Sequence, residues 1–193
     1  MTSTTGGMHQ QRAALRIDDP FMAEPLIEET TRHRAYRFTL AVTRLAIGWV
    51  FLWAFLDKLF GLGHETASKG AWINGGSPTA GFLGKATEGP FAGAYQNIAG
   101  AGWADALFMI GLAGIGTALI LGVAMRIASA AGATLMVLMW TAVLPPASNP
   151  FMDYHLIYAL VLVVLALTAA GRTLGLAKMW ERLPIVNRYG FLR

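Results

Sequence analysis

Four long apolar windows dominate the pattern of hydrophobic and polar positions along the chain. They cover residues 38–60, 106–125, 127–144 and 151–170, and charged, glycine-rich or proline-rich residues separate them. A helix rises about 1.5 Å per residue, so each window can cross roughly 30 Å of hydrocarbon. The windows lack the alternating polarity of barrel strands. The pattern therefore predicts an all-α fold, an integral membrane four-helix bundle.

The composition supports this prediction. Hydrophobic residues make up 55% of the 193 residues and charged residues 13%, whereas a soluble domain carries about a quarter charged residues. The chain has no cysteine, so it cannot itself supply a disulfide, an iron–sulfur cluster or a covalent haem attachment, and we expect no haem. The net charge of +4 suits anionic lipid better than nucleic acid, for which the sequence has no motif.

The distribution of basic residues predicts the orientation. Both termini are rich in arginine and Arg126 lies in the shortest connection, whereas the loop 61–105 has Lys69 and Lys85. By the positive-inside rule, both termini are cytoplasmic and the chain is a multi-pass protein of the cell membrane. We therefore expect a polar cytoplasmic tail (1–35), a four-span membrane domain (36–172) and a cytoplasmic interfacial tail (173–193).

The long outer loop, residues 61–105, is expected to contain short interfacial helices, because forty residues without structure are unusual in a compact protein. Helices can begin at Pro78, which follows a serine, and at Pro90, which follows a glycine. Trp72 and Trp103 lie near the two ends of the loop and are expected to anchor it at the membrane interface.

The stretch 174–183 has Trp180 between Lys178 and Arg182 and is followed by Pro184. This combination predicts one short helix that lies on the inner interface, ends at the proline and anchors the chain.

Small residues predict where the spans pack. Gly114, Ala118 and Gly122 recur every four residues in the second span, as do Ala128 and Gly132 in the third. Such ridges let helices approach closely in lipid, so we expect these two spans to be antiparallel neighbours that pack through them.

Ionisable residues inside the windows are the candidates for chemistry, because each is costly in a bilayer. Arg44 and Lys58 share one face of the first span, about 21 Å apart, and Asp57 projects elsewhere. Arg44 can bond to backbone carbonyls or lipid phosphate, and Lys58 can reach the headgroups. Asp153 and His155 open the last span, two residues apart, so they are expected to project to different sides and form no obvious pair.

Chain topology places Asp57, Lys58, Asp105, Asp153 and His155 at the outer ends of the spans, and we expect them to converge on one pocket. A carboxylate at a helix start such as Asp105 is unremarkable, so we take the other four as candidate catalytic residues. Arg44, Lys58 and Trp72 are candidate substrate-binding residues. Such a cluster could exchange protons with a quinol or hold a small anion. A metal site from His64, Glu65, Asp153 and His155 is an alternative, but the spacing of these residues does not favour it, and we assign no metal.

Three groups of residues resemble the DoxX/DoxD family. In the first span they are residues 44–48 (RLAIG), 51–52 (FL) and 57–59 (DKL). In the last span they are 149–150 (NP), 153–155 (DYH) and 171–172 (GR). The loop segments 71–83 (AWINGGSPTAGFL) and 89–91 (GPF) are similar to the DoxD-like branch, and the resemblance covers about residues 36–180.

This resemblance implies a four-helix membrane protein and, for the DoxD-like branch, the large membrane subunit of a thiosulfate:quinone oxidoreductase. Quinone would accept the electrons and tetrathionate would be the product. The second, smaller subunit domain that is fused to some relatives is not in this chain, so we expect other membrane protein subunits as partners. A non-catalytic subunit that stabilises a larger respiratory or redox complex is the alternative. Transport of a small anion or lipid is a third hypothesis, which the lack of an interrupted span disfavours.

Overall fold

The computed structural model describes residues 20–147 and 149–192, and every regular element among them is a helix. The longer helices are α1 (Pro20–Phe60), α4 (Gly102–Leu121), α5 (Met125–Ala142) and α6 (Tyr154–Leu167). The short α-helices are α2 (Ala80–Lys85), α3 (Ala92–Ile98), α7 (Ala177–Trp180) and α8 (Pro184–Arg188). Four 3-10 turns are η1 (Ser68–Gly70), η2 (Trp72–Asn74), η3 (Ala170–Arg172) and η4 (Gly190–Leu192). The prediction of an all-α chain is confirmed.

Among the described residues, three helices are long and apolar enough to cross a membrane. They are α1 from Thr30 onward, α4 and α5. The prediction of a membrane protein is therefore supported by the length and composition of these helices. α6 is apolar but has 14 residues, which corresponds to about 21 Å.

α6 is shorter than the predicted window 151–170 for local reasons. Its N-cap, Asp153, has extended backbone angles (φ −140°, ψ −178°), so the helix begins only at Tyr154. After the C-cap, Thr168, Ala169 adopts a left-handed conformation (φ 49°), which ends the helix before residue 170.

The chain divides into two units, Met1–Tyr36 and Arg37–Arg193, which we call the N-terminal unit and the membrane unit. In the N-terminal unit, α1 is helical from Pro20, although the sequence predicted a polar tail up to residue 35. Alanine, leucine, methionine and glutamate are common in this stretch and favour helix without an apolar face. Residues 1–19 of the predicted tail lie outside the described residues.

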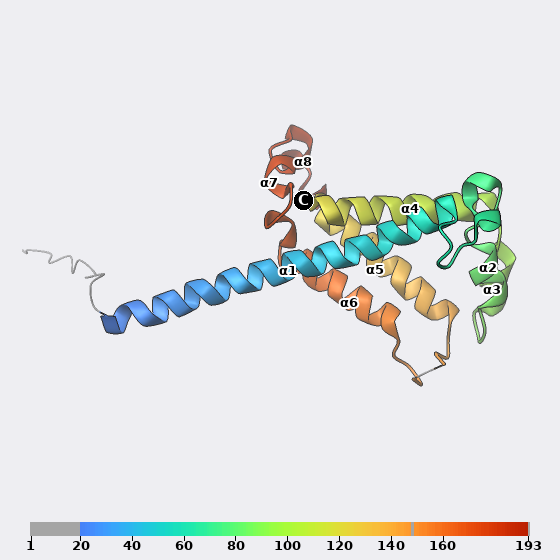
Figure 1. Cartoon of the computed structure of the whole chain (residues 1–193), viewed down its shortest axis with the longest axis horizontal. Helices are drawn as coiled ribbons and strands as arrows, with labels where there is room; N and C mark the ends of the chain where they lie inside the picture. Colours follow the sequence, from blue (N-terminus) through green and yellow to red (C-terminus); the bar gives the residue numbers. More distant parts are fainter. Residues whose placement is uncertain (1–19, 148, 193) are drawn as a thin grey trace, which may run out of the picture. The chain divides into compact units, whose positions relative to one another are not determined.

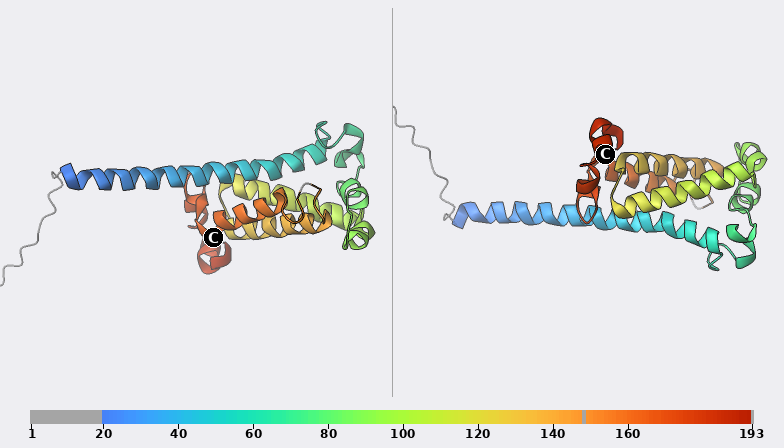
Figure 2. Two further views of the ribbon diagram at one scale, coloured as in Figure 1. Left: turned by 90° about the horizontal axis from the view of Figure 1, so that it is seen from below. Right: turned by 90° about the horizontal axis from the view of Figure 1, so that it is seen from above.

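The membrane unit has a core built by four helices. In Figures 1 and 2, α4, α5 and α6 lie alongside the C-terminal part of α1, and α5 packs most extensively against α6. Burial of apolar side chains in this core excludes both water and lipid from the helix contacts. The buried residues of this core include Phe51 of α1, Leu112 and Leu119 of α4, Met136 of α5, and Leu162 and Leu165 of α6.

Two glycines set the approach of α1 to α4. A Cβ added at Gly116 would lie 2.6 Å from the backbone nitrogen of Leu52, and one at Gly48 would lie 3.0 Å from the Cβ of Leu119. The prediction that Gly114 belongs to the packed ridge of α4 is therefore wrong. Gly114 is exposed, and the face of α4 that packs against α1 contains Gly116 instead.

The prediction for α5 is confirmed at Gly132. A Cβ added there would lie 3.0 Å from the Leu162 side chain and 3.2 Å from that of Ile115. α5 therefore packs against both α4 and α6 through a position that has no side chain. Ala128, one turn earlier, is also buried.

The structure of residues 174–188 differs from the single helix predicted for residues 174–183. α7 has four residues, and Pro184 occupies the first turn of α8 instead of only ending the preceding helix. A proline fits the first helical turn because its missing N–H would have no intrahelical partner there. The segment is thus two short helices joined by a turn.

Candidate functional site

The turn before α6 positions the first candidate residues. The Asn149 Oδ1 atom accepts hydrogen bonds from the backbone N–H groups of Phe151 (3.0 Å) and Met152 (2.9 Å). The Trp140 indole N–H of α5 donates to the carbonyl of Phe151 at 2.9 Å, and the two rings meet edge to face. This turn is therefore fastened both to itself and to α5, which fixes the backbone just before Asp153.

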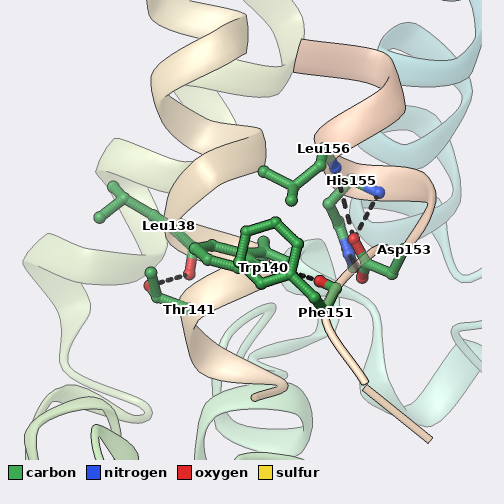
Figure 3. A network of polar contacts seen from close by, with 7 residues as sticks. All are labelled: Leu138, Trp140, Thr141, Phe151, Asp153, His155 and Leu156. Carbon is green, nitrogen blue, oxygen red and sulfur yellow. Dashed lines mark hydrogen bonds and ion pairs between the residues drawn. The ribbon is translucent and has the colours of Figure 1, made fainter. Parts of the chain in front are cut away.

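Asp153 is the N-cap of α6. Its Oδ1 atom accepts hydrogen bonds from the backbone N–H groups of His155 (3.0 Å) and Leu156 (3.3 Å). Its other oxygen, Oδ2, lies 2.6 Å from Nδ1 of His155, so the carboxylate also contacts the imidazole (Figure 3). Asp153 therefore caps α6, whereas Asn149 stabilises the preceding turn.

The expectation that Asp153 and His155 form no pair is wrong. It assumed that both residues have helical backbone angles, in which case they would point to different sides. Because Asp153 is extended, its side chain turns back over the first helical turn and meets the ring of His155.

His155 has one ring nitrogen without a partner. Its side chain is 2% exposed, and its Nε2 atom has no hydrogen-bond partner among the described residues. The ring of Tyr154 lies against it, with centroids 4.1 Å apart and planes inclined by 30°. An ionised carboxylate can only accept, so the bond to Asp153 places a proton on Nδ1 and leaves Nε2 able to exchange a proton.

An open apolar groove of about 540 Å³ lies between α5 and α6. It extends from Ala133 and Val163 to Leu138, near the C-terminal end of α5, and Met152, just before α6. Met152 directly precedes Asp153, and Leu156 directly follows His155 and also lines the groove. The groove therefore reaches the turn that carries the aspartate–histidine pair.

Asp57 is buried near the C-terminal end of α1 and binds backbone. Its carboxylate accepts hydrogen bonds from the N–H groups of His64 (3.3 Å), Glu65 (3.1 Å) and Thr66 (2.8 Å). These three contacts satisfy the carboxylate and fold the chain back after the helix ends at Gly61, where φ is +66°. Asp57 therefore holds the start of the long loop.

Lys58 follows Asp57 but points to a different partner. Its Nζ atom lies 3.2 Å from an oxygen of Glu65, and the two side chains are 16% and 80% exposed. An ion pair with so exposed a partner is well solvated and weak.

Asp105 is a buried carboxylate at the same end that the candidate set omitted. It accepts hydrogen bonds from the Thr79 hydroxyl (2.6 Å), the Thr79 N–H (3.0 Å) and the Ser77 hydroxyl (2.9 Å). The helix dipole alone explains an aspartate in the first turn of a helix, so the sequence did not indicate that Asp105 binds the loop at Ser77 and Thr79.

Arg44 is fully buried and its two terminal nitrogens bind backbone carbonyls. One nitrogen donates to Leu119 and to Ile120 (2.9 Å) at the C-terminal end of α4, and the other donates to Thr173 (3.3 Å) and Leu174 (2.8 Å). Carbonyls at the C-terminal end of a helix carry partial negative charge, which suits a cation. The carbonyl-bonding role considered for Arg44 is confirmed, and both of its terminal nitrogens are occupied by backbone carbonyls.

The structure thus separates the residues that we expected in one pocket. Asp153 and His155 form one group, and Asp57 and Lys58 bind the loop 64–66; no hydrogen bond or ion pair joins the two groups among the described residues. Asp57 and Lys58 lie near the C-terminal end of α1, whereas Asp153 and His155 lie at the start of α6. Trp72 is half-buried in η2.

In the described part of the chain, no group of three or more histidine, aspartate or glutamate side chains could hold a metal ion. The alternative site of His64, Glu65, Asp153 and His155 is not assembled: His64 packs edge-on against the ring of Trp53, whereas His155 lies against Tyr154.

The chain matches no described protein family, no curated protein and no solved structure.

Proposed function

We propose that this protein is a four-span subunit of the cell membrane, of the DoxX/DoxD type, that exchanges protons with a membrane quinone at Asp153 and His155. The observation that carries the proposal is the buried His155 ring, held by Asp153 at Nδ1 and without a partner at Nε2. A buried polar atom without a partner is costly, which favours a ligand or water at that position.

The residues present fit a quinone. The α5–α6 groove is apolar along its length and suits an isoprenoid tail, and its outer end adjoins Asp153 and His155. When bound, the quinone supplies an acceptor for two electrons and two protons. His155 can donate a proton from Nε2 when charged and accept one when neutral, and the Asp153 carboxylate stabilises the charged ring.

Thiosulfate, or a related small sulfur anion, is the electron donor that we propose from the resemblance. Two thiosulfate anions lose one electron each and join through a new S–S bond to give tetrathionate, so one quinone is reduced. We assign Lys58 to the attraction of the anion, since Arg44 is occupied by carbonyls. The chain has no cysteine, so the oxidation requires a partner subunit.

The same proposal gives the topology. α6 and the residues around it form the fourth span, α2 and α3 lie at the outer interface, and both termini are cytoplasmic. Support comes from the charges: the connection at Arg126 and the C-terminal segment are basic, and Asp57, Asp105 and Asp153 lie at the opposite end.

The test uses the full chain purified with its co-extracted partners. When thiosulfate is added, the protein should reduce a soluble quinone analogue, and His155→Leu should lower the rate of quinone reduction about a hundredfold. His64→Leu is the matched control, since His64 lies at the same end but has no carboxylate on its ring, and it should keep the wild-type rate. An unchanged rate in His155→Leu would contradict the assignment of this residue.

A non-catalytic subunit that stabilises a larger redox complex is the second candidate. It is favoured by Arg44, Asp57 and Asp105, whose hydrogen bonds among the described residues go to groups of this chain and give each of them a structural role. Native mass spectrometry of gently extracted protein separates the two functions. Partner subunits without quinone favour the second, whereas bound quinone that is lost in His155→Leu favours the first.

A further inference from the structure

The C-terminal segment, residues 172–192, exposes basic and apolar side chains together. Lys178, Arg182 and Arg188 are exposed, and the one acidic residue of the segment, Glu181, is paired with Arg172 at 3.1 Å. Large apolar side chains are exposed between them, with exposed fractions of 58% for Leu174, 64% for Met179, 59% for Ile185 and 61% for Phe191.

This segment is fastened to the membrane unit. Its backbone is tied at Leu176, whose N–H donates to the carbonyl of Leu121 at 2.7 Å, and at Gly190, whose carbonyl accepts from Arg126 at 3.0 Å. Val186 is fully buried, and the Trp180 indole N–H donates to the carbonyl of Leu192 at 2.6 Å. The exposed side chains therefore belong to a fixed surface.

The cations of this surface are available to a ligand. Lys178 and Arg182 are four residues apart, and the side chain of neither has a hydrogen bond or an ion pair to the rest of residues 20–147 and 149–192. Exposed apolar residues alone suit any hydrophobic partner, and basic residues alone suit any anion. Their mixture matches the headgroup region of a bilayer, where acyl chains and phosphates lie a few ångströms apart.

We propose that residues 172–192 form a docking surface for anionic phospholipids in the leaflet next to the C-terminal end of α4. Lys178 and Arg182 bind the lipid phosphates and the additional negative charge of the headgroup. Met179 and Ile185 insert among the acyl chains. The surface recognises lipid charge and is independent of the site at His155.

The experiment measures lipid retention by native mass spectrometry. The full chain in mild detergent is incubated with equal amounts of phosphatidylglycerol and phosphatidylcholine of identical acyl chains. The wild type should retain phosphatidylglycerol in excess, and the double variant Lys178→Gln/Arg182→Gln should lower this preference at least about fivefold, the effect of one basic residue near an anionic surface. Raised salt should lower the wild-type preference as well.

The matched control is Lys69→Gln/Lys85→Gln, which removes two lysines of the long loop and should leave the preference unchanged. Met179→Ser/Ile185→Ser should lower retention of both lipids and leave their ratio unchanged. Equal retention of the two lipids by the wild type overturns the proposal. A loss of the phosphatidylglycerol preference in Lys69→Gln/Lys85→Gln as large as that in Lys178→Gln/Arg182→Gln overturns it as well. Loss of an acidic protein partner from Lys178→Gln/Arg182→Gln at an unchanged lipid ratio overturns it in favour of a protein ligand.

Discussion

The two ends of the membrane unit solve the problem of buried charge in opposite ways. At the end where α4 stops, one cation, Arg44, is surrounded by carbonyl oxygens. At the other end three carboxylates, Asp57, Asp105 and Asp153, accept hydrogen bonds from backbone N–H groups. In both cases backbone groups are partners of the charge, and Asp153 in addition contacts the ring of His155. Bonding to backbone avoids removing a second charge from water for the same interaction.

The difference lies in what remains unused. Asp57 and Asp105 have three hydrogen bonds each, and both terminal nitrogens of Arg44 are occupied. Two of these groups have a buried polar atom without a partner in the described residues, Nε of Arg44 and Nε2 of His155, and of the two only the histidine is linked to a carboxylate. Structural roles thus account for most of the buried charges, and His155 is the candidate for proton exchange.

Arg44→Met should have the largest effect on stability. It leaves buried carbonyls of α4 and of residues 173–174 without their donor, at a cost of about 3 kcal/mol or more. For a chain of this size we expect the midpoint of thermal unfolding in detergent to fall by about 6–12 °C. Arg44→Lys keeps the positive charge but has fewer hydrogen-bond donors, so its unfolding midpoint should lie between those of the wild type and Arg44→Met. An Arg44→Met midpoint equal to that of the wild type would show that the bonds of Arg44 to carbonyls do not stabilise this end of the membrane unit.

Asp57→Ala should have a smaller, local effect. Three backbone N–H groups lose their acceptor, but they lie near the surface and water can replace the carboxylate, so we expect a cost of about 1–3 kcal/mol. Amide hydrogen exchange should accelerate at residues 64–66. Exchange should stay unchanged near Thr79, which binds Asp105. Acceleration at both places would show that the loop unfolds as one piece.

Lys58→Gln should change stability by less than about 1 kcal/mol, because its ion pair with Glu65 is mostly exposed. The wild-type unfolding midpoint should shift towards that of the variant as salt is raised, since salt screens an exposed pair. A shift in Lys58→Gln as large as that in Arg44→Met would mean that this lysine is structurally required.

His155→Leu should also have a small effect on stability, a loss of about 1 kcal/mol or less. Leucine is apolar and of similar size; the variant loses the bond between Nδ1 and Asp153 but also removes the buried Nε2 atom that has no partner, and the two changes partly offset each other. Asp153 keeps its bonds to two backbone N–H groups. Thermal unfolding measures this directly, and a loss comparable to that of Arg44→Met would assign the histidine a structural role.

Apolar windows predicted the helical class and the helices α1, α4 and α5 with fair accuracy, because burial in lipid requires long uninterrupted runs. Boundaries were less predictable. α4 ends at Leu121 because Gly122 adopts a left-handed conformation (φ 70°), which hydropathy does not record. Gly116 and Gly114 are equally small, and only the orientation of the packed face distinguishes them.

The candidate site was predicted in part. The residue types and the end of the bundle at which they lie follow from where each helix begins or stops. The pairing of Asp153 with His155 depends on one extended residue before α6, which periodicity cannot reveal. Likewise, the partners of Asp57 are N–H groups seven to nine residues further along, and a residue pattern does not specify contacts with backbone.

The bonding of Arg44 also has a consequence for biosynthesis. The arginine is made with the first helix, but its acceptors belong to the end of α4 and to residues 173–174, which follow α6. A first helix that enters the bilayer during translation therefore carries an arginine that costs about 2.5–3.5 kcal/mol and has no tertiary partner yet. Its insertion is supported by its apolar neighbours alone, and the bonds of the arginine are complete only after α4, α5 and α6 have been synthesised.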